Sequence, residues 1–421
     1  MLSLPVTTAE FAASMAPLGP FGPAPRLAAG VSGGPDSMAL ALLADRWTRD
    51  NGGSLLALVA DHGLRPESRD EAALAAARLA ARGIRARLLP IDGLLQGSAL
   101  AERARVARFR VLEAACREAG ILHLVLGHHA ADQAETVLIR SLSDSGPIGM
   151  AGMLPLTELT WLRLVRPLLA FPPARLRATL AAEGVEWIED PSNKSAAALR
   201  PRLRLLRRDQ GGIGAATGAL RVTATAAAQH RAARANTAAA GLADEVVIRP
   251  EGFAILSGRP VPTDVLAALL QALSGAAYPP PSRRVTTLAA APRPATLAGV
   301  RLLPAGRLGP GLLLVREAAA MASPVPAQPN TIWDGRFRLR GNASVPTGAM
   351  LGSLGEDAVR VRQLSPLPSA VLRTLPAVRL GSTVHAVPHL DFPDAETCEH
   401  LSLLFCPLRA AAPPSFPFGD A

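Results

Sequence analysis

Apolar runs and longer helical patterns alternate along the first third of the chain. Leu55–Ala60 and Ile121–Leu126 are short continuous apolar runs, as expected of strands buried on both faces, and Arg85–Pro90 predicts a further strand. Between them, Glu71–Arg82 is rich in alanine and Ala101–Glu118 repeats apolar residues near the helical period, so both predict helices. This alternation predicts an α/β fold with a parallel sheet, whose ligands bind beyond the carboxyl ends of the strands.

The segment Leu27–Leu43 reads as a strand, a glycine-rich turn and the start of a helix. Its two glycines permit positive φ and a close approach of the backbone to a ligand. Free N–H groups and serine hydroxyls at the start of a helix attract anions. No lysine follows the turn, which excludes a Walker A loop. We therefore predict a phosphate site formed by Ser32, Gly33, Gly34, Pro35, Asp36 and Ser37.

Two more polar strings follow predicted strands. Asp61 and His62 come directly after Ala60, and a longer string after Leu126 runs into a helix. In that helix His129, Asp132 and Glu135 lie on roughly one face, at three-residue spacing. Carboxylates at this position suit Mg²⁺, which prefers oxygen ligands. A polar helix N-terminus would by itself also explain Asp132, because acidic residues are favourable in a first turn.

Beyond Arg208 the pattern changes. Alanine-rich helix follows a glycine-rich joint, Val246–Leu256 reads as a strand, and short strands such as Val359–Val361 stand among proline and glycine turns. We predict a catalytic domain, then a helical linker with a small mixed α/β domain, then a mostly β domain. Their ranges are 1–208, 209–325 and 326–421.

The composition narrows the class of protein. The chain has a net charge of +10, and Lys194 is its single lysine, so arginine supplies the basic balance that favours a polyanionic partner. Its three cysteines lack C-x-x-C spacing, which argues against a disulfide framework, a zinc ribbon or an iron–sulfur site and suits a reducing cytoplasm. We find no signal peptide and no uncharged run of about 18 residues, so we expect a cytoplasmic protein without a membrane partner.

Taken together, the strings S-G-G-P-D-S, D-H-G-L-R-P-E-S and H-H-x-x-D-Q-x-E-T resemble those of the tRNA(Ile)-lysidine synthetases. These belong to the PP-loop pyrophosphatases, which split ATP between the α and β phosphates. Arg105, Arg108–Phe109, Arg166–Leu169 and Glu186–Asn193 match the same family. The resemblance implies an adenine nucleotide alpha hydrolase-like, Rossmann-like catalytic domain.

The resemblance also implies a reaction. ATP would adenylate the C2 carbonyl oxygen of the wobble cytidine in the isoleucine tRNA with a CAU anticodon, and free L-lysine would then displace AMP. ATP and Mg²⁺ are the implied cofactors, with Asp36 and Asp132 as metal ligands; a homodimer is left open. The implied catalytic residues are Asp36, Asp132, Glu135, His129 and Arg105. The implied nucleotide-binding residues are Ser32, Gly33, Gly34, Pro35, Asp36, Ser37, Asp61 and His62.

Two positions depart from the family pattern. Ala131 stands where the family usually has an aspartate, and Pro201 replaces the asparagine of an R-N-R motif. Two alternatives therefore stay open: another PP-loop tRNA-modifying enzyme, such as a thiolase, and a tRNA-binding protein that has lost catalysis. A thiolase would usually need cysteines near the active site, and Cys116 is the only one in the first domain.

Overall fold

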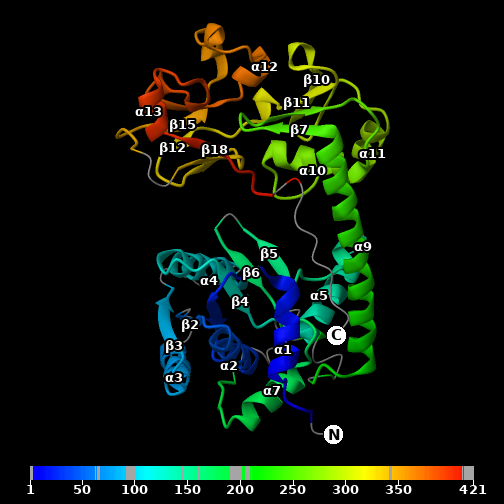
Figure 1. Ribbon diagram of the computed structural model, residues 1–421, viewed down its shortest axis with the longest axis vertical. Coiled ribbons are helices and arrows are strands. Elements are labelled where there is room, and N and C mark those ends of the chain that lie inside the picture. Colours follow the sequence, from blue (N-terminus) through cyan, green and yellow to red (C-terminus); the bar gives the residue numbers. More distant parts are fainter. Residues whose placement is uncertain are drawn as a thin grey trace. The chain divides into compact units, whose positions relative to one another are not determined.

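The computed structural model describes residues 3–61, 63, 67–91, 100–143, 147–159, 161–189, 202–203, 209, 211–340, 344–409 and 411. They form two compact units (Figure 1), the first within Met1–Ala232 and the second within Ala233–Ser415. Helix α9 (Ala215–Glu245) begins in the first unit and ends in the second. Among the helices so described, none is both long and apolar enough to cross a membrane.

The first unit is built on a six-stranded sheet with the order β3-β2-β1-β4-β6-β5. Neighbouring strands are parallel except at the edge, where β5 runs antiparallel to β6. The predicted parallel sheet is therefore confirmed. The strands are β1 (Arg26–Val31), β2 (Ser54–Asp61), β3 (Arg85–Pro90), β4 (His123–Leu126), β5 (Leu156–Glu158) and β6 (Arg163–Val165).

Helices cover both faces of this sheet, which explains why its central strands read as continuous apolar runs. Along β1, Leu27 and Ala29 pack into one core with α1, α2, α3 and α7, whereas Ala28 packs into a second core with α4. Helices α2 and α4 thus belong to different cores, and Figure 1 shows them in separate places beside the sheet. The helices are α1 (Thr8–Met15), α2 (Pro35–Asp50), α3 (Ser68–Ala80), α4 (Leu100–Glu118), α5 (Ala130–Leu142), α6 (Pro147–Met150) and α7 (Pro173–Ala182).

A buried histidine makes the first unit sensitive to acid. His123 is only 6% exposed, and burial together with the charge of Arg163 lowers its pKa to about 4 from 6.5. As pH falls below 6.5 the unfolded chain takes up a proton that the folded protein refuses until about pH 4, so stability is lost across this window. Between pH 6.5 and 5, the free energy of unfolding should therefore fall by about 2 kcal/mol less in His123→Gln than in the wild type. Urea unfolding at the two pH values measures this difference. Equal losses would contradict this assignment.

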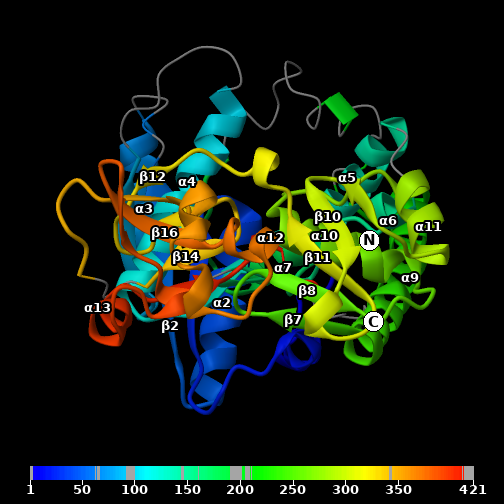
Figure 2. The same cartoon turned by 90° about the horizontal axis from the view of Figure 1, so that it is seen from above.

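The second unit contains an antiparallel sheet with the order β7-β8-β11-β10-β9. Helix α10 and helix α11 pack on one face of it through an apolar core, and Figure 2 shows α10 beside β10 and β11. The elements are β7 (Val246–Arg249), β8 (Phe253–Leu256), α10 (Thr263–Ser274), α11 (Ser282–Ala290), β9 (Ala295–Leu297), β10 (Val300–Pro304) and β11 (Leu312–Arg316).

The remainder of the second unit is mostly β and covers the other face of that sheet. Leu313 and Val315 of β11 pack against Leu354 and Leu372 from the C-terminal part of the chain. Two small sheets follow, with the orders β12-β15-β16-β17 and β13-β14-β18. The elements are β12 (Val325–Pro326), β13 (Ile332–Trp333), β14 (Phe337–Leu339), β15 (Met350–Ser353), α12 (Ser369–Leu372), β16 (Pro376–Leu380), β17 (Thr383–Ala386), α13 (Ala395–His400) and β18 (Leu403–Phe405).

Buried ion pairs join these two parts of the second unit. Asp334, which follows β13, accepts hydrogen bonds from Nε of Arg316 at 3.1 Å and from Nε of Arg336 at 2.8 Å. The Asp334 side chain is 2% exposed and that of Arg336 is fully buried. Arg336 also donates to the carbonyl of Gly252, in the β7–β8 turn. One carboxylate thus holds two guanidinium groups away from water.

Two of the predicted strands were wrong. Val246–Leu256 is a hairpin of β7 and β8 rather than one strand, because Gly252 turns the chain with a φ of +83°. Val359–Val361 forms no strand; Val359 is the last residue of a short 3₁₀ helix at Gly355–Val359. Val361 is buried in the core that β11 shares with the C-terminal part, so packing accounts for its apolar character.

Candidate active site

The turn between β1 and α2 has the backbone of an anion-binding loop. Gly33 has a φ of +81°, in the left-handed region that favours glycine. Gly34 is the extended residue before the helix, and Pro35 opens α2, where its missing N–H costs little. The unpaired N–H groups of the first helical turn therefore face the end of β1, where the helix dipole favours negative charge.

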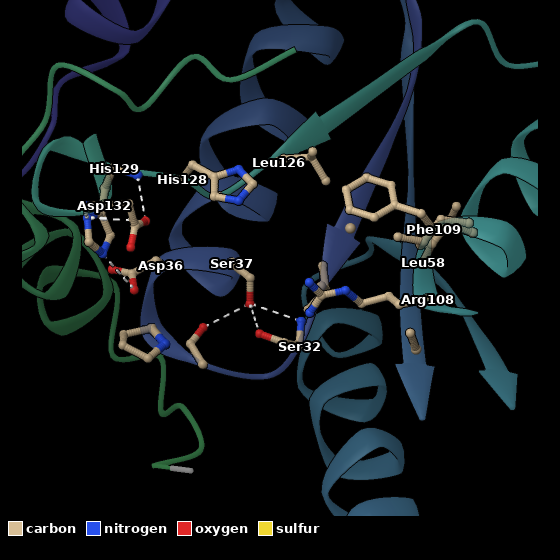
Figure 3. Close-up of a pocket in the computed structure, with 17 residues that line it drawn as sticks. Ser32, Asp36, Ser37, Leu58, Arg108, Phe109, Leu126, His128, His129 and Asp132 are labelled. Atoms are coloured by element: carbon tan, nitrogen blue, oxygen red, sulfur yellow. Dashed lines mark hydrogen bonds and ion pairs between the residues drawn. The ribbon is translucent and has the colours of Figure 1, made fainter. Parts of the chain in front are cut away.

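The side chain of Ser37 stabilises this loop through hydrogen bonds. Its hydroxyl accepts the backbone N–H of Ser32 at 3.1 Å and donates to the carbonyl of Gly34 at 3.0 Å. The two serine hydroxyl oxygens lie 3.2 Å apart (Figure 3). Contacts within the loop thus fix its shape.

A histidine caps the helix that follows β4. Nδ1 of His129 accepts the backbone N–H of Asp132 at 3.3 Å, and Oδ2 of Asp132 accepts the backbone N–H of His129 at 3.1 Å. Since Nδ1 is an acceptor, the ring proton belongs on Nε2, which lies 3.3 Å from Oδ2 of Asp36 and can donate to it. His129 therefore links the carboxylates of Asp36 and Asp132, as Figure 3 shows.

These groups line a cavity of about 300 Å³ at the carboxyl ends of β1, β2 and β4. Its polar side carries the serines, Asp36, His129 and Asp132, and its apolar side comes from strands and α4 (Figure 3). One side thus suits phosphates and the other a flat, largely apolar ring. The apolar lining residues are Val31, Pro35, Leu58, Ala60, Phe109, Leu112 and Leu126.

Arginines also lie in and near the cavity, in addition to the carboxylates of Asp36 and Asp132. Arg108 lines the cavity, and burial together with the charge of Arg105 lowers the pKa of Arg108. Burial also lowers the pKa of His128 to about 4, with the charge of Asp132 opposing the shift and the charges of Arg166, Arg105 and Arg108 adding to it. Nδ1 of His128 is buried and has no hydrogen-bond partner in the described part of the chain. A neutral imidazole among arginines suits a site for an anion.

Some predicted site residues lie away from this cavity. Gly33, Arg105 and Glu135 are not among its described lining residues; Arg105 lies over the ring of Phe109 and Glu135 is fully buried. Asp61 accepts hydrogen bonds from the N–H of Gly63 and the hydroxyl of Ser68. The Asp61 carboxylate thus bonds to two residues that follow β2. His62 lies outside the described residues.

The residues that sequence reasoning missed are mainly apolar. Leu58, Leu112 and Leu126 look like ordinary core positions, and no local signal separates a residue that lines a cavity from one that fills a core. Arg105 and Arg108 share a helix face by spacing, yet of the two only Arg108 is among the described lining residues. His128 could have been predicted as a site residue, because it belongs to the same polar string as His129.

The carboxylates fit a hard divalent cation. Oδ1 of Asp36 is buried and lacks a hydrogen-bond partner among the residues with described positions. Asp132 lies on the other side of the His129 ring. No cluster of three or more His, Cys, Asp or Glu side chains able to hold a metal occurs within the described ranges. Two carboxylates therefore fit Mg²⁺, which commonly takes its other ligands from phosphate oxygens and water.

Ala131 packs against the turn before α9. It is 5% exposed and is not among the described residues that line the cavity. A Cβ built on Gly212 would lie 3.3 Å from the Cβ of Ala131, so the turn that leads into α9 packs closely over this residue. In this arrangement a longer side chain at position 131 would meet that turn. Pro201, the other departure, lies outside the described residues.

Cys116 belongs to the core. It is fully buried on α4, and burial, with a smaller contribution from the charge of Glu113, raises the pKa of its thiol to about 12. A thiol in this state is a poor nucleophile, because the thiolate is the reactive form. Chemistry that depends on a reactive cysteine in the first unit is therefore disfavoured.

A phosphate-type loop at the switch between β1 and β4, beside a ring-sized apolar surface, defines a nucleotide-binding α/β domain. A family model described as a PP-loop domain matches residues 7–208, which identifies this class as the ATP-binding PP-loop domains.

Three relatives, each named tRNA(Ile)-lysidine synthase, extend the match. The one from Bradyrhizobium sp. (strain BTAi1) is 44% identical over 57% of this chain, and the match spans 66% of its own length, just under two thirds. The relative from Mesorhizobium japonicum is 35% identical and covers 87% of this chain and 84% of its own. The relative from Ruegeria pomeroyi is 32% identical, with 90% and 91% covered. The chain belongs to the tRNA(Ile)-lysidine synthase family.

Proposed function

We propose that this protein ligates L-lysine to C2 of the wobble cytidine in the isoleucine tRNA with a CAU anticodon. ATP is consumed to AMP and pyrophosphate, and the product reads AUA instead of AUG. The observation that carries this proposal is the cavity that combines the Ser32–Ser37 loop with Asp36, His129 and Asp132. The names of relatives that match most of the chain supply the RNA and amino-acid substrates.

ATP would lie across the cavity. The adenine would rest against Leu58, Ala60 and Phe109, and the phosphates would reach the first turn of α2. Asp36 and Asp132 would hold Mg²⁺, which when bound neutralises phosphate charge. The loop N–H groups would stabilise the charge that develops on the leaving pyrophosphate as the C2 oxygen of cytidine bonds to the α phosphorus.

In the second step the ε-amine of lysine attacks C2, the bond from C2 to the adenylate oxygen breaks, and AMP leaves. The amine must lose a proton. His129 lines the cavity whereas Glu135 is not among its described lining residues, so we assign the proton transfer to His129. The proton would go to Nδ1, which would give up the hydrogen bond that it accepts from the backbone N–H of Asp132. The carboxylates of Asp36 and Asp132 on either side of its ring would stabilise the imidazolium that forms.

His129→Asn separates the capping role from this catalytic role. Asparagine is a good N-cap residue, so α5 should keep its stability. Its side chain is too short to reach Asp36, so lysine transfer should fall by about 10²-fold, the scale typical of general acid–base catalysis. We would measure initial rates together with the melting temperature. A rate within threefold of wild type would remove His129 from the reaction.

The tRNA would be held mainly through its phosphates, in keeping with the net charge of +10. One exposed aromatic residue in the second unit fits an unpaired base. Tyr278 is 83% exposed, just before three prolines and helix α11. Arg283 and Arg284 are exposed in the first turn of that helix, where cations gain nothing from the helix dipole.

Tyr278→Ala should weaken tRNA binding about tenfold, since stacking of one base contributes about 1–3 kcal/mol. Tyr278→Phe keeps the ring and should bind like wild type. Filter binding at several salt concentrations would measure this, and Arg283→Ala should reduce the salt slope by about one. Unchanged affinity of Tyr278→Ala would exclude stacking at this residue.

The proposal is tested with radiolabelled lysine, ATP and a transcript of the CAU-anticodon tRNA. We expect label in the RNA, and none in a matched transcript with uridine at the wobble position. Absence of label from both transcripts would sink the enzyme hypothesis and favour an RNA-binding protein without catalysis.

A further inference from the structure

The stretch that follows α7 contacts the phosphate loop through Ile188, which is not among the described residues that line the cavity. The backbone N–H of Ile188, in the stretch after α7, donates to the carbonyl of Gly33 at 2.9 Å. A Cβ built on Gly33 would lie 2.7 Å from Cδ1 of Ile188 and 3.3 Å from the Cβ of Ala75 on α3. Gly33 is therefore enclosed between Ile188 and α3.

This contact sets the direction of a peptide group in the loop. In a trans peptide the C=O and the N–H of the next residue point in opposite directions. Because the Gly33 carbonyl points out toward Ile188, the N–H of Gly34 points the other way. Gly34 lines the cavity and Gly33 is not among its described lining residues. The hydrogen bond to Ile188 thus keeps one N–H of the loop aimed at the place where a phosphate would bind.

The segment that carries Ile188 is itself anchored. The backbone N–H of Val185 donates to the carbonyl of Leu180 in α7 at 2.9 Å, a bond that does not depend on the side chain at this position. Glu186 pairs with Arg78 of α3 at 2.6 Å. Ile188 and its neighbour Trp187 pack against the core that contains α2 and α3. The position of Ile188 is thus tied to two helices of the first unit.

We propose that Ile188 is a positioning residue for the phosphate loop, acting on ATP through Gly33 and Gly34. The proposal rests on the ATP use proposed above. Ile188 touches no reacting atom; its side chain fills the space behind Gly33 and its N–H fixes the peptide between the glycines. Loss of the side chain keeps the N–H of residue 188 but opens the space beside Gly33. The peptide between the glycines is then less restrained and can turn, which withdraws a donor from the phosphates.

ATP and pyrophosphate binding to the whole chain, with Mg²⁺ and without tRNA or lysine, test this role by calorimetry. Ile188→Ala should raise the Kd for both about tenfold and leave the Kd for tRNA unchanged, whereas Ile188→Val should restore most of the affinity. Val185→Ala is the matched control: it removes a buried side chain from the same segment, but Val185 is not among the nearest neighbours of Gly33. It should lower the melting temperature and leave the Kd for ATP unchanged.

A double-mutant cycle sharpens the test. Gly33→Ala places a methyl group against Ile188 and strains a positive φ, so it should weaken ATP binding strongly. With Ile188→Ala already present the clash is gone, so the second loss should be smaller than the first. Equal Kd values for ATP in Ile188→Ala, Val185→Ala and wild type would overturn the positioning role alone. Failure of the wild-type protein to bind ATP would overturn the proposed function as well.

Discussion

Replacing Asp36 by alanine is expected to lower the rate of lysine transfer by about 10³-fold and to leave tRNA affinity unchanged. Asp36 stands in the first turn of α2, and its Oδ1 is buried without a hydrogen-bond partner in the described residues. Its Oδ2 lies 3.3 Å from His129. Alanine would remove both the proposed ligand for Mg²⁺ and the carboxylate that orients the His129 ring.

Asp50→Ala is the matched control for this variant. Asp50 ends the same helix, is exposed, and is not among the described residues that line the cavity. Initial rates at saturating ATP over a range of Mg²⁺ concentrations, with melting temperatures for both variants, separate chemistry from folding. If Asp36→Ala kept a rate within threefold of Asp50→Ala, the assignment of Asp36 to the reaction would be refuted.

The second large effect concerns stability. Asp334→Asn should destabilise the second unit by about 3 kcal/mol or more, because it leaves the buried guanidinium groups of Arg316 and Arg336 without a countercharge. Burial already lowers the pKa of Arg336 to about 10, against the opposing charge of Asp334, so the cation stays charged at neutral pH. The fully buried Trp333 lies next to this carboxylate and reports the transition by fluorescence.

A less buried ion pair provides the comparison. Asp357 pairs with Arg379 at 2.8 Å, and these side chains remain 24% and 19% exposed. Asp357→Asn should cost about 1 kcal/mol, since water can solvate the groups that lose their partner. Urea unfolding of both variants measures the difference. Equal costs for the two substitutions would mean that burial does not control the strength of the Asp334 network.

The fold of the first unit could be predicted because local patterns and packing agree. Leu55–Ala60 is a continuous apolar run because β2 is covered on both faces, and its length excludes a helix. The loop before α2 was predictable because glycine, proline and serine each have a specific backbone role there. In the second unit, Val246–Leu256 was wrongly predicted as one strand, because its many apolar residues were given more importance than the turn signal at Gly252.

The site could be predicted only in part, because sequence spacing does not give the rotation of a helix relative to its sheet. The spacing of His129, Asp132 and Glu135 predicted that they share one helix face. In the structure, His129 precedes the helix and caps it. Glu135 is fully buried and is not among the described residues that line the cavity. Asp61 stands at a strand end as expected but bonds to its own turn. Ile188 lies in the Glu186–Asn193 string that matches the family, but its contact with Gly33 could not be predicted, because it joins residues far apart in sequence.

Product stoichiometry provides the most direct measurement of the proposed chemistry. With α-labelled ATP, labelled lysine and the CAU-anticodon transcript, we expect one AMP and one pyrophosphate for each lysine attached, with all of the lysine on the wobble cytidine. Formation of ADP, lysine attached at another nucleotide, or AMP released without lysine transfer would contradict adenylation of cytidine by this site.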